Sequence, residues 1–440
     1  MLTAAATLAY TPQPRRADTP CAPRQRQRAA AVSAVANELS AGLPAELSIG
    51  LPAADTFPPW EPRSFFRFEV LHESRKPGSR ARLGRIHTPH GTIDTPSYVP
   101  VGTSAALKGL TNEMAVAAGV ELMFCNTYHL MVHPGSETVA AAGGLHEYMR
   151  RPGPIITDSG GFQVFSLARA TSEDGPELKR RTDKKNEATL TRVSEHGVSF
   201  RSYFDPAVEI ELTPESSVRA QKDLGSDIII PLDELPPYHI TRERLAQSVA
   251  LSHRWEARSL REHLGDVRQQ AMYAVVHGGT DEALRRHSAE YLSSLPFDGF
   301  AIGGSLGRDG AEMVAMLSKL MGWLPRQRPN HLLGISDEAS VRAVVPLGID
   351  TFDSCLATRV ARHGSLYTRG GTVNIGQGKY RADFGPIDPT LPTIEHSRAY
   401  LHHLYRVREP LFQTLASLHN LMYMGALTKE LRERIAADDI

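Results

Sequence analysis

Residues 272–304 read MYAVVHGGTDEALRRHSAEYLSSLPFDGFAIGG, and this stretch carries the pattern that decides the fold. It holds two short apolar runs, Met272–Val276 and Gly299–Ile302, separated by a segment with a helical pattern. Short apolar strands alternating with helices are typical of parallel sheets, because each helix returns the chain to the start of the next strand. The stretch therefore predicts two parallel strands joined by a helix.

The same pattern recurs along most of the chain. Eight apolar runs predict strands near Ser97–Val101, Glu121–Cys125, Pro154–Thr157, Asp227–Leu232, Met272–Val276, Gly299–Ile302, His331–Ile335 and Thr351–Leu356. Eight such strands predict an α/β fold, the (β/α)8 TIM barrel. Residues 64–98 instead show the short runs of antiparallel hairpins, Phe65–Val70, Ala81–Ile86 and Gly91–Asp94.

A helical subdomain is expected at the C-terminal end, over residues 385–435. From Ser397 onward the apolar spacing is that of helices. Tyr400, Leu401, Leu404 and Tyr405 are spaced to form one packed face.

Polar residues and glycines follow nearly every predicted strand. Asp158, Asp233 and Asp353 each stand at or just beyond such an end. Active sites of this barrel lie at the carboxyl ends of its strands. Converging carboxylates suit glycosidic chemistry, in which one attacks the anomeric carbon and another handles the leaving-group proton. These residues alone leave glycosyl transfer and sugar hydrolysis equally open.

Charge and cysteine content limit the class of protein. Lys plus Arg and Asp plus Glu each number 49 among 440 residues, so no global positive field marks a general nucleic-acid binder. Cys21, Cys125 and Cys355 are too few and too scattered for a disulfide framework, and they exclude a full cysteine zinc cluster. No apolar run reaches the roughly 20 residues of a membrane span, so we expect no membrane partner.

Two segments depart from this average composition. Residues 1–55 form a leader whose first part is rich in Arg and Ala and nearly free of acids, which is typical of an organelle transit peptide. A disordered tail is the alternative. We expect a chloroplast rather than a mitochondrial destination, and otherwise a cytoplasmic protein. Residues 171–192 form a polar insertion with clustered Lys and Arg, which either meets a polyanion or stays a solvated loop.

Seven blocks of sequence occur in a fixed order. They are Asn126–Leu130, Gly143–His146, Ile156–Gln163, Gly225–Ile229 leading to Asp233-Glu234, Phe297–Gly304, Gly348–Asp353 and Ser397–His403. Together they closely resemble the queuine/guanine tRNA-ribosyltransferases, also called tRNA-guanine transglycosylases. The resemblance runs over residues 64–435, which would form one transglycosylase domain.

The resemblance implies a base-exchange reaction on tRNA. Asp353 would be the nucleophile that attacks C1′ of the wobble guanosine, giving a covalent intermediate. Asp158 would be the general acid and base, protonating the departing guanine and deprotonating the incoming base. The substrates would be tRNAs with a G-U-N anticodon (Tyr, His, Asn and Asp), and the incoming base queuine or a related 7-deazaguanine. A homodimer or a heterodimer with a homologue is expected.

Further residues acquire binding roles through the same resemblance. Asp233 would accept hydrogen bonds from the base amino and ring N–H groups. Ser159 and the backbone N–H of Gly304 would complete the polar edge, while Phe162 and Leu333 sandwich the ring. The remaining positions are Gly303, where a side chain would block the backbone's approach, and Arg359 and Arg362, which would meet the anticodon loop.

The sequence departs from the family pattern at three places. His277 stands where we expect Gln; its ring N–H can still donate to the base carbonyl, with added pH sensitivity. Gly307 leaves room for the cyclopentenediol ring of queuine, which favours queuine over the smaller precursor base. Asp388, Thr390 and Thr393 replace the three cysteines of a zinc site, and only its histidine, His419, remains. We therefore predict no cofactor.

The lost cysteines support a rival interpretation, a non-catalytic tRNA-binding subunit that pairs with an active homologue. Such subunits typically lose the catalytic acids, whereas this chain keeps Asp158, Asp233 and Asp353. An active transglycosylase is therefore the leading hypothesis, and a sugar hydrolase would leave the glycines of the base site without a purpose.

Overall fold

A computed structural model describes residue 47 and residues 50–440 except 168–188, 203, 206 and 392. Most of the predicted leader (1–55) and of the polar insertion (171–192) lies outside the described residues. The described end of the leader contacts the barrel domain, because the Tyr291 hydroxyl donates to the carbonyl of Pro52 at 3.1 Å. Within the described residues, no helix is long and apolar enough to cross a membrane.

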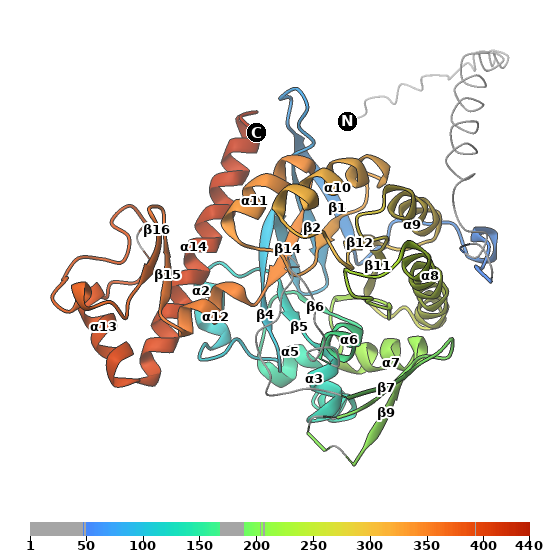
Figure 1. The fold of residues 1–440 in the computed structure, drawn as a ribbon, viewed down its shortest axis with the longest axis horizontal. Helices are drawn as coiled ribbons and strands as arrows, with labels where there is room; N and C mark the ends of the chain where they lie inside the picture. The colour runs from blue at the N-terminus through green and yellow to red at the C-terminus, as the bar shows by residue number, and fades with distance from the viewer. Residues whose placement is uncertain (1–46, 48–49, 168–188, 203, 206, 392) are drawn as a thin grey trace, which may run out of the picture. The chain divides into compact units, whose positions relative to one another are not determined.

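Eight parallel strands close into a barrel, which confirms the predicted (β/α)8 fold (Figure 1). The last of them pairs with the first, in parallel, through Thr351 and Ser97. In barrel order the strands are β4 (Ser97–Gly102), β5 (Met123–Cys125), β6 (Ile155–Thr157), β10 (Ile228–Ile229), β11 (Ala271–Val276), β12 (Gly299–Ile302), β13 (Asn330–Leu332) and β14 (Thr351–Ser354).

Most strands differ from their predicted bounds by one or two residues, and two differ by more. β10 is far shorter than the predicted strand Asp227–Leu232. The reason is that the side-chain amide of Gln221 accepts from Ile230 N at 3.0 Å and donates to Ile230 O at 2.8 Å, so these backbone groups do not pair with a neighbouring strand. β13 was predicted to continue to Ile335 but ends at Leu332. The chain turns soon afterwards, at Gly334, whose φ of +76° breaks a strand.

Helices follow the strands and surround the barrel (Figure 1). The first half contributes α2 (Asn112–Ala117), α3 (Thr127–Val132), α4 (Ser136–Ala141), α5 (Leu145–Met149), α6 (Gly161–Leu167) and α7 (Pro214–Leu224). The second half contributes α8 (Arg242–Gly265), α9 (Glu282–Ser294), α10 (Gly310–Trp323), α11 (Glu338–Val344) and α12 (Leu356–Arg362). Several begin at side-chain caps, as α9 does at Asp281, whose carboxylate accepts from Leu284 N at 3.0 Å.

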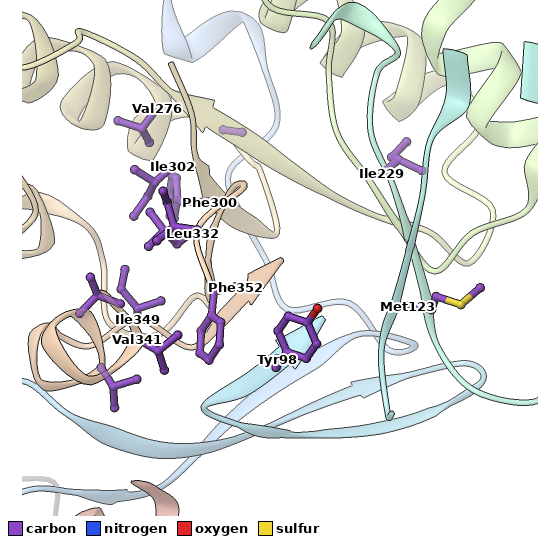
Figure 2. Close-up of a cluster of buried hydrophobic side chains, with 14 of the residues drawn as sticks. Tyr98, Met123, Ile229, Val276, Phe300, Ile302, Leu332, Val341, Ile349 and Phe352 are labelled. Carbon is purple, nitrogen blue, oxygen red and sulfur yellow. The ribbon is translucent and has the colours of Figure 1, made fainter. Parts of the chain in front are cut away.

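Side chains of the strands alternate between two apolar layers, as the period of a strand requires. Tyr273 and Val275 of β11 point into the barrel, where they join one buried cluster. Val276 of the same strand faces the helices and belongs to a second cluster with Val341 of α11. Figure 2 shows this outer layer. Every strand is therefore buried on both faces, which fixes the strand ends relative to one another.

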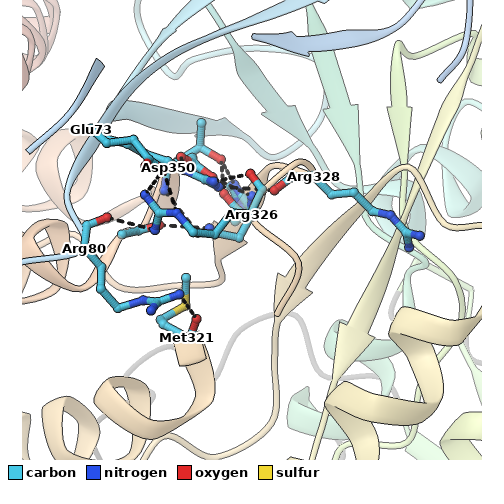
Figure 3. Close-up of polar contacts among 11 residues, drawn as sticks. Glu73, Arg80, Met321, Arg326, Arg328 and Asp350 are labelled. Carbon is cyan, nitrogen blue, oxygen red and sulfur yellow. Dashed lines mark hydrogen bonds and ion pairs between the residues drawn. The ribbon is translucent and has the colours of Figure 1, made fainter. Parts of the chain in front are cut away.

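An antiparallel sheet covers the amino-terminal end of the barrel, as predicted from residues 64–98. It consists of β1 (Arg67–Glu73), β2 (Arg82–Thr88) and β3 (Gly91–Thr95). Ile86 and Ile93 join the interior cluster of the barrel. Arg82 is buried and makes a bidentate ion pair with Asp350, at 2.8 and 2.6 Å, just before β14. Figure 3 labels Asp350 among the polar contacts of this region. This contact fastens the first sheet to the last strand.

A histidine clamp also holds this sheet to the barrel. Asp227 accepts from Nδ1 of His90, in the β2–β3 turn, at 2.8 Å and from Nε2 of His146 at 3.1 Å. The two imidazole rings stack at 3.5 Å with 14° between their planes. Oδ2 of Asp227 also accepts from Ile155 N at 2.8 Å, so both carboxylate oxygens are engaged in hydrogen bonds that hold the sheet to the barrel.

Two additions were not predicted. A sheet of β7 (Thr189–Val193), β8 (Val198–Arg201) and β9 (Glu209–Leu212) lies between α6 and α7. A hairpin of β15 (Ser365–Thr368) and β16 (Gly371–Asn374) follows α12.

The predicted C-terminal helices are present as α13 (Arg398–Val407) and α14 (Pro410–Ala436), and α14 packs on α12 and β4. The predicted packed face is only partly correct. Leu401 and Leu404 are buried, but Tyr400 is 40% exposed and stacks on His396.

Candidate active site

Asp158 lies at the end of β6, in a buried nest of hydrogen-bond donors. Its Oδ2 accepts from Asn126 Nδ2 at 2.7 Å and from Gln163 Nε2 at 2.9 Å, and its Oδ1 accepts from Thr127 N at 2.8 Å. Burial raises the pKa of the Asp158 carboxyl above its ordinary value, and the hydrogen bonds from Asn126 and Gln163 offset this only in part. A carboxyl in this setting can hold a proton and then return it, as a general acid requires.

Asp353, on β14, is held at one oxygen. Its Oδ1 lies 3.1 Å from His331 Nε2 and accepts from Gly334 N at 3.0 Å. With the proton on Nε2, His331 donates to Asp353 while its Nδ1 lies 2.8 Å from the Thr351 hydroxyl. Among the residues that the structure describes, none donates a hydrogen bond to Oδ2 of Asp353. This fixed carboxylate with one uncommitted oxygen suits nucleophilic attack.

The predicted base-binding residues of β11, β12 and β13 come together at the same end of the barrel. A Cβ built on Gly303 would lie 2.5 Å from Val275 and 3.5 Å from the Leu333 side chain. A Cβ built on Gly304, where φ is +71°, would lie 3.6 Å from Nδ1 of His277. Both glycines therefore allow an approach that a side chain would hinder.

The carboxylate predicted to bind the base also lies beside this cluster. Asp233 Oδ2 is 3.4 Å from His277 Nε2, and its side chain is 16% exposed. Ser159 is buried, and its hydroxyl accepts from Gly161 N at 3.3 Å. Phe162, in the first turn of α6, is 46% exposed and so lies at the rim rather than in the core.

Arg285 of α9 holds the loops that carry these residues, and no local pattern in the sequence indicates this role. It is fully buried and donates to four carbonyls, those of Val276, Gly279, Gly303 and Ser305, at 2.6 to 2.9 Å. Burial lowers the pKa of Arg285 to about 9. One side chain thus joins the ends of β11 and β12.

A cavity of about 370 Å³ opens beside His277 and Gly304. The β10–α8 loop, the first turns of α8 and the loop that follows β11 complete its lining. Gly307, which we expected to make room for queuine, does not line this cavity. Its φ is +109°, and a Cβ there would lie 2.9 Å from Glu312, so local backbone geometry explains the glycine.

The two arginines predicted to meet tRNA lie on α12, directly after Asp353. Arg359 donates to Cys355 Sγ at 3.0 Å, and Arg362 donates to Thr358 O at 2.9 Å. Burial lowers the pKa of Arg362. Across the described part of the chain, neither arginine forms an ion pair with a carboxylate, and this leaves their charge available to a phosphate.

The residues at the four expected zinc-ligand positions form a hydrogen-bonded network instead. Asp388 Oδ1 accepts from the Thr390 hydroxyl at 2.7 Å, and its Oδ2 accepts from Arg369 N at 2.7 Å. The Thr393 hydroxyl lies 2.6 Å from Nδ1 of His419, whose Nε2 lies 2.7 Å from Tyr367 O. Burial lowers the pKa of His419. Two hydroxyls, and a histidine with both nitrogens engaged, do not fit a tetrahedral zinc ion.

The barrel and its strand-end carboxylates define an enzyme that acts on a glycosidic bond. A sequence profile of the family described as Queuine tRNA-ribosyltransferase matches residues 77–440. A protein of that name from Protochlamydia amoebophila is 53% identical over 378 residues, covering 85% of this chain and 96% of that protein. One from Chlamydia caviae is 49% identical, covering 85% and 99%. The chain belongs to the queuine tRNA-ribosyltransferase family and is a pentosyltransferase.

Proposed function

We propose that this protein is a tRNA-guanine transglycosylase that replaces the wobble guanine of tRNA by double displacement. Asp353 Oδ2 attacks C1′ of the ribose, the C1′–N9 bond breaks, and Asp158 gives its proton to N9 of guanine. The incoming base then loses its N9 proton to Asp158 and attacks C1′, and Asp353 leaves. The observation that carries the proposal is the Asp353 carboxylate, fixed at Oδ1 while no described residue donates to Oδ2.

The base is recognised by the residues around Gly303. Asp233 accepts from the amino and ring N–H groups, and His277 with the N–H of Gly304 donates to the carbonyl. Ser159 completes the polar edge, and Phe162 and Leu333 sandwich the ring. Queuine is the incoming base, and the support for it is the cavity beside His277 and Gly304, which can receive a bulky substituent.

The tRNA substrates are those with a G-U-N anticodon, for Tyr, His, Asn and Asp. Arg359 and Arg362 contact the anticodon loop, and their place on α12, the helix that follows Asp353, supports this. The rival function, a non-catalytic partner subunit, is disfavoured because Asp158 and Asp353 are both present and both hydrogen-bonded in a reactive arrangement.

Exchange of radiolabelled guanine into a G-U-N tRNA tests this function. Wild-type protein should label the tRNA and form an adduct that survives a denaturing gel. Asp353→Asn keeps the size and the Oδ1 contacts but lacks the nucleophile, so exchange should fall by about 10⁴-fold or more, and the adduct should vanish, while tRNA affinity stays. Adduct formation by Asp353→Asn would overturn the assignment, and no exchange by wild type would favour the partner subunit.

We also propose that the C-terminal subdomain works without structural zinc. Within the network of Asp388, Thr390, Thr393 and His419, the Thr393–His419 contact supports this because it joins the same loop and helix that a metal would join. The bond between Asp388 and Thr390 lies within the loop. A homodimer or heterodimer is supported by apolar side chains exposed on α13 and α14, Val407 at 56% and Leu411 at 42%. Light scattering of the pure protein separates a homodimer from a monomer that requires a homologue.

The leader, we infer, directs the chain to an organelle, with the chloroplast favoured. Its acid-poor, Arg-rich composition supports this. The match to the relatives covers 96–99% of them but only 85% of this chain, so this chain carries sequence that they lack. A fluorescent fusion of residues 1–55 should enter an organelle, and purely cytosolic fluorescence would refute the idea.

A further inference from the structure

Glu256, on α8, is a fully buried carboxyl for which the proposed chemistry has no use. Its Oε2 accepts from Val275 N at 2.9 Å. This bond has a structural reason, because β10 ends opposite Met272 and gives no carbonyl to Val275. Its Oε1 is different: it is shielded from solvent and has no hydrogen-bond partner among the residues described. A buried polar atom left in this state calls for an explanation.

The side chain of His277 lies between Oε1 of Glu256 and the proposed base site. Oε1 of Glu256 lies 3.7 Å from Nε2 of His277, and Asp233 Oδ2 lies 3.4 Å from the same nitrogen. The backbone N–H of His277 donates to the Ser288 hydroxyl at 3.0 Å, which anchors the residue. Its other ring nitrogen, Nδ1, is the one near Gly304. One nitrogen thus faces two carboxyl groups, and the other faces the expected position of the base carbonyl.

A neutral imidazole carries only one N–H, so the side on which it lies decides what the ring can bind. If His277 gives its Nε2–H to Asp233, Nδ1 is an acceptor and repels a carbonyl oxygen. To donate to the base, the ring must carry a proton on Nδ1. A donor toward Nε2, or a second ring proton, is then required.

We propose that Glu256 is a positioning residue for His277: one proton shared between Oε1 and Nε2 leaves the other ring proton on Nδ1, facing the base carbonyl. The proton count is the same whether the shared proton sits on Glu256 or on His277. In this arrangement the Nε2 proton is shared with Glu256 rather than donated to Asp233, the residue proposed to accept the N–H groups of the base. The inference rests on the proposed function and adds a determinant of its base recognition.

The electrostatics of the site agree with this arrangement. Burial, and then the charge of Asp233, raise the pKa of Glu256 well above its ordinary value, so the carboxyl tends to keep its proton. His253 contacts the same Ser288 hydroxyl as the His277 backbone, and burial lowers the pKa of His253 well below its ordinary value, so this histidine adds no positive charge to the cluster. Glu256 is therefore the group in this cluster that can serve as a donor toward Nε2.

Two variants of similar size separate positioning from packing. Glu256→Met removes the donor and should raise the KM for guanine about tenfold with kcat nearly unchanged, as expected for one lost hydrogen bond. Glu256→Gln should restore the KM, because its amide donates to Nε2 while its carbonyl accepts from Val275. His277→Gln brings its own amide N–H, so adding Glu256→Met to it should raise the KM no further. An unchanged KM in Glu256→Met, or no rescue by Gln, would overturn the proposal.

Nitrogen-15 NMR of histidine-labelled protein shows which ring nitrogen of His277 carries the proton, and it needs no activity assay. The His277 signals are those lost in His277→Gln. Wild type should show the proton on Nδ1, and Glu256→Met should move it to Nε2. A wild-type ring protonated only on Nε2 would refute the inference even if Glu256→Met did not fold. If wild type exchanges no guanine, the proposed function fails, but the tautomer still tests the Glu256 assignment.

Discussion

Thr393→Val tests whether hydrogen bonds hold the C-terminal subdomain where a metal was expected. Valine keeps the shape of threonine but removes the hydroxyl that lies 2.6 Å from Nδ1 of His419. The ring itself is fully buried, and its Nε2 stays engaged with Tyr367 O. Nδ1 would then lack its partner in a place that water does not reach.

The size of the effect follows from that geometry. Leaving a buried acceptor unsatisfied costs about 1–3 kcal/mol. That is a sizeable part of the roughly 5–15 kcal/mol by which a folded protein is stable. We expect the free energy of unfolding to fall by about 2 kcal/mol. Thr393→Ser keeps the hydroxyl and should cost clearly less.

Urea unfolding of the three proteins, followed by circular dichroism, measures this difference. A parallel scan with a chelator and elemental analysis of zinc complete the assay. We expect well under one zinc per chain and no change in Tm on chelation. Equal stability of Thr393→Val and wild type would refute the network as the stabilising element. Unfolding on chelation would show that Asp388 and His419 hold a metal after all.

Three further predictions concern the site. Because burial raises the pKa of Asp158, its acid form persists to higher pH than that of an ordinary aspartate; the rate of adduct formation should fall as pH rises through that raised value, and a rate unchanged from pH 4 to 9 would contradict the general-acid role. Replacing Arg359 and Arg362 by Gln should raise the KM for tRNA about tenfold per arginine at low salt, without changing the KM for guanine; equal effects on both would indicate a structural role. Arg285→Met removes the donor of the Gly279, Gly303 and Ser305 carbonyls, while that of Val276 keeps Gly303 N at 3.2 Å, so denaturant unfolding should show a loss of about 3 kcal/mol or more, with Arg285→Lys in between.

The barrel could be predicted from the sequence because strands buried on both faces read as continuous apolar runs. The prediction of the barrel is wrong where the side chain of a distant residue replaces pairing between strand backbones. β10 shrinks because Gln221 binds the backbone of Ile230, and no local pattern reports such a contact. The β7–β9 sheet was missed because β7 begins inside the polar insertion, whose charged residues indicate a loop, although Glu209–Leu212 alternates as a strand does.

Some residues of the candidate site could likewise be predicted from the sequence, and others could not. Asp158 and Asp353 could be found because they end apolar runs, and their position there follows from the fold. The groups that hold them come from elsewhere in the chain: Asn126 is 32 residues from Asp158, and His331 is 22 from Asp353. The burial of Glu256 could not be predicted, because an acid inside a helix normally indicates an exposed face. Only the packing of α8 on β11 shows that it is buried.

The ion pair of Arg82 and Asp350 has a consequence for synthesis of the chain. The two residues are 268 positions apart, and both are buried in the finished protein. Until the ribosome has translated Asp350, Arg82 and the apolar face of β2 stay exposed to water or bound by a chaperone. Any chain cut before Asp350 would keep that arginine and the open edge of β4 exposed. Protein quality control could therefore recognise a truncated chain by this unsealed end.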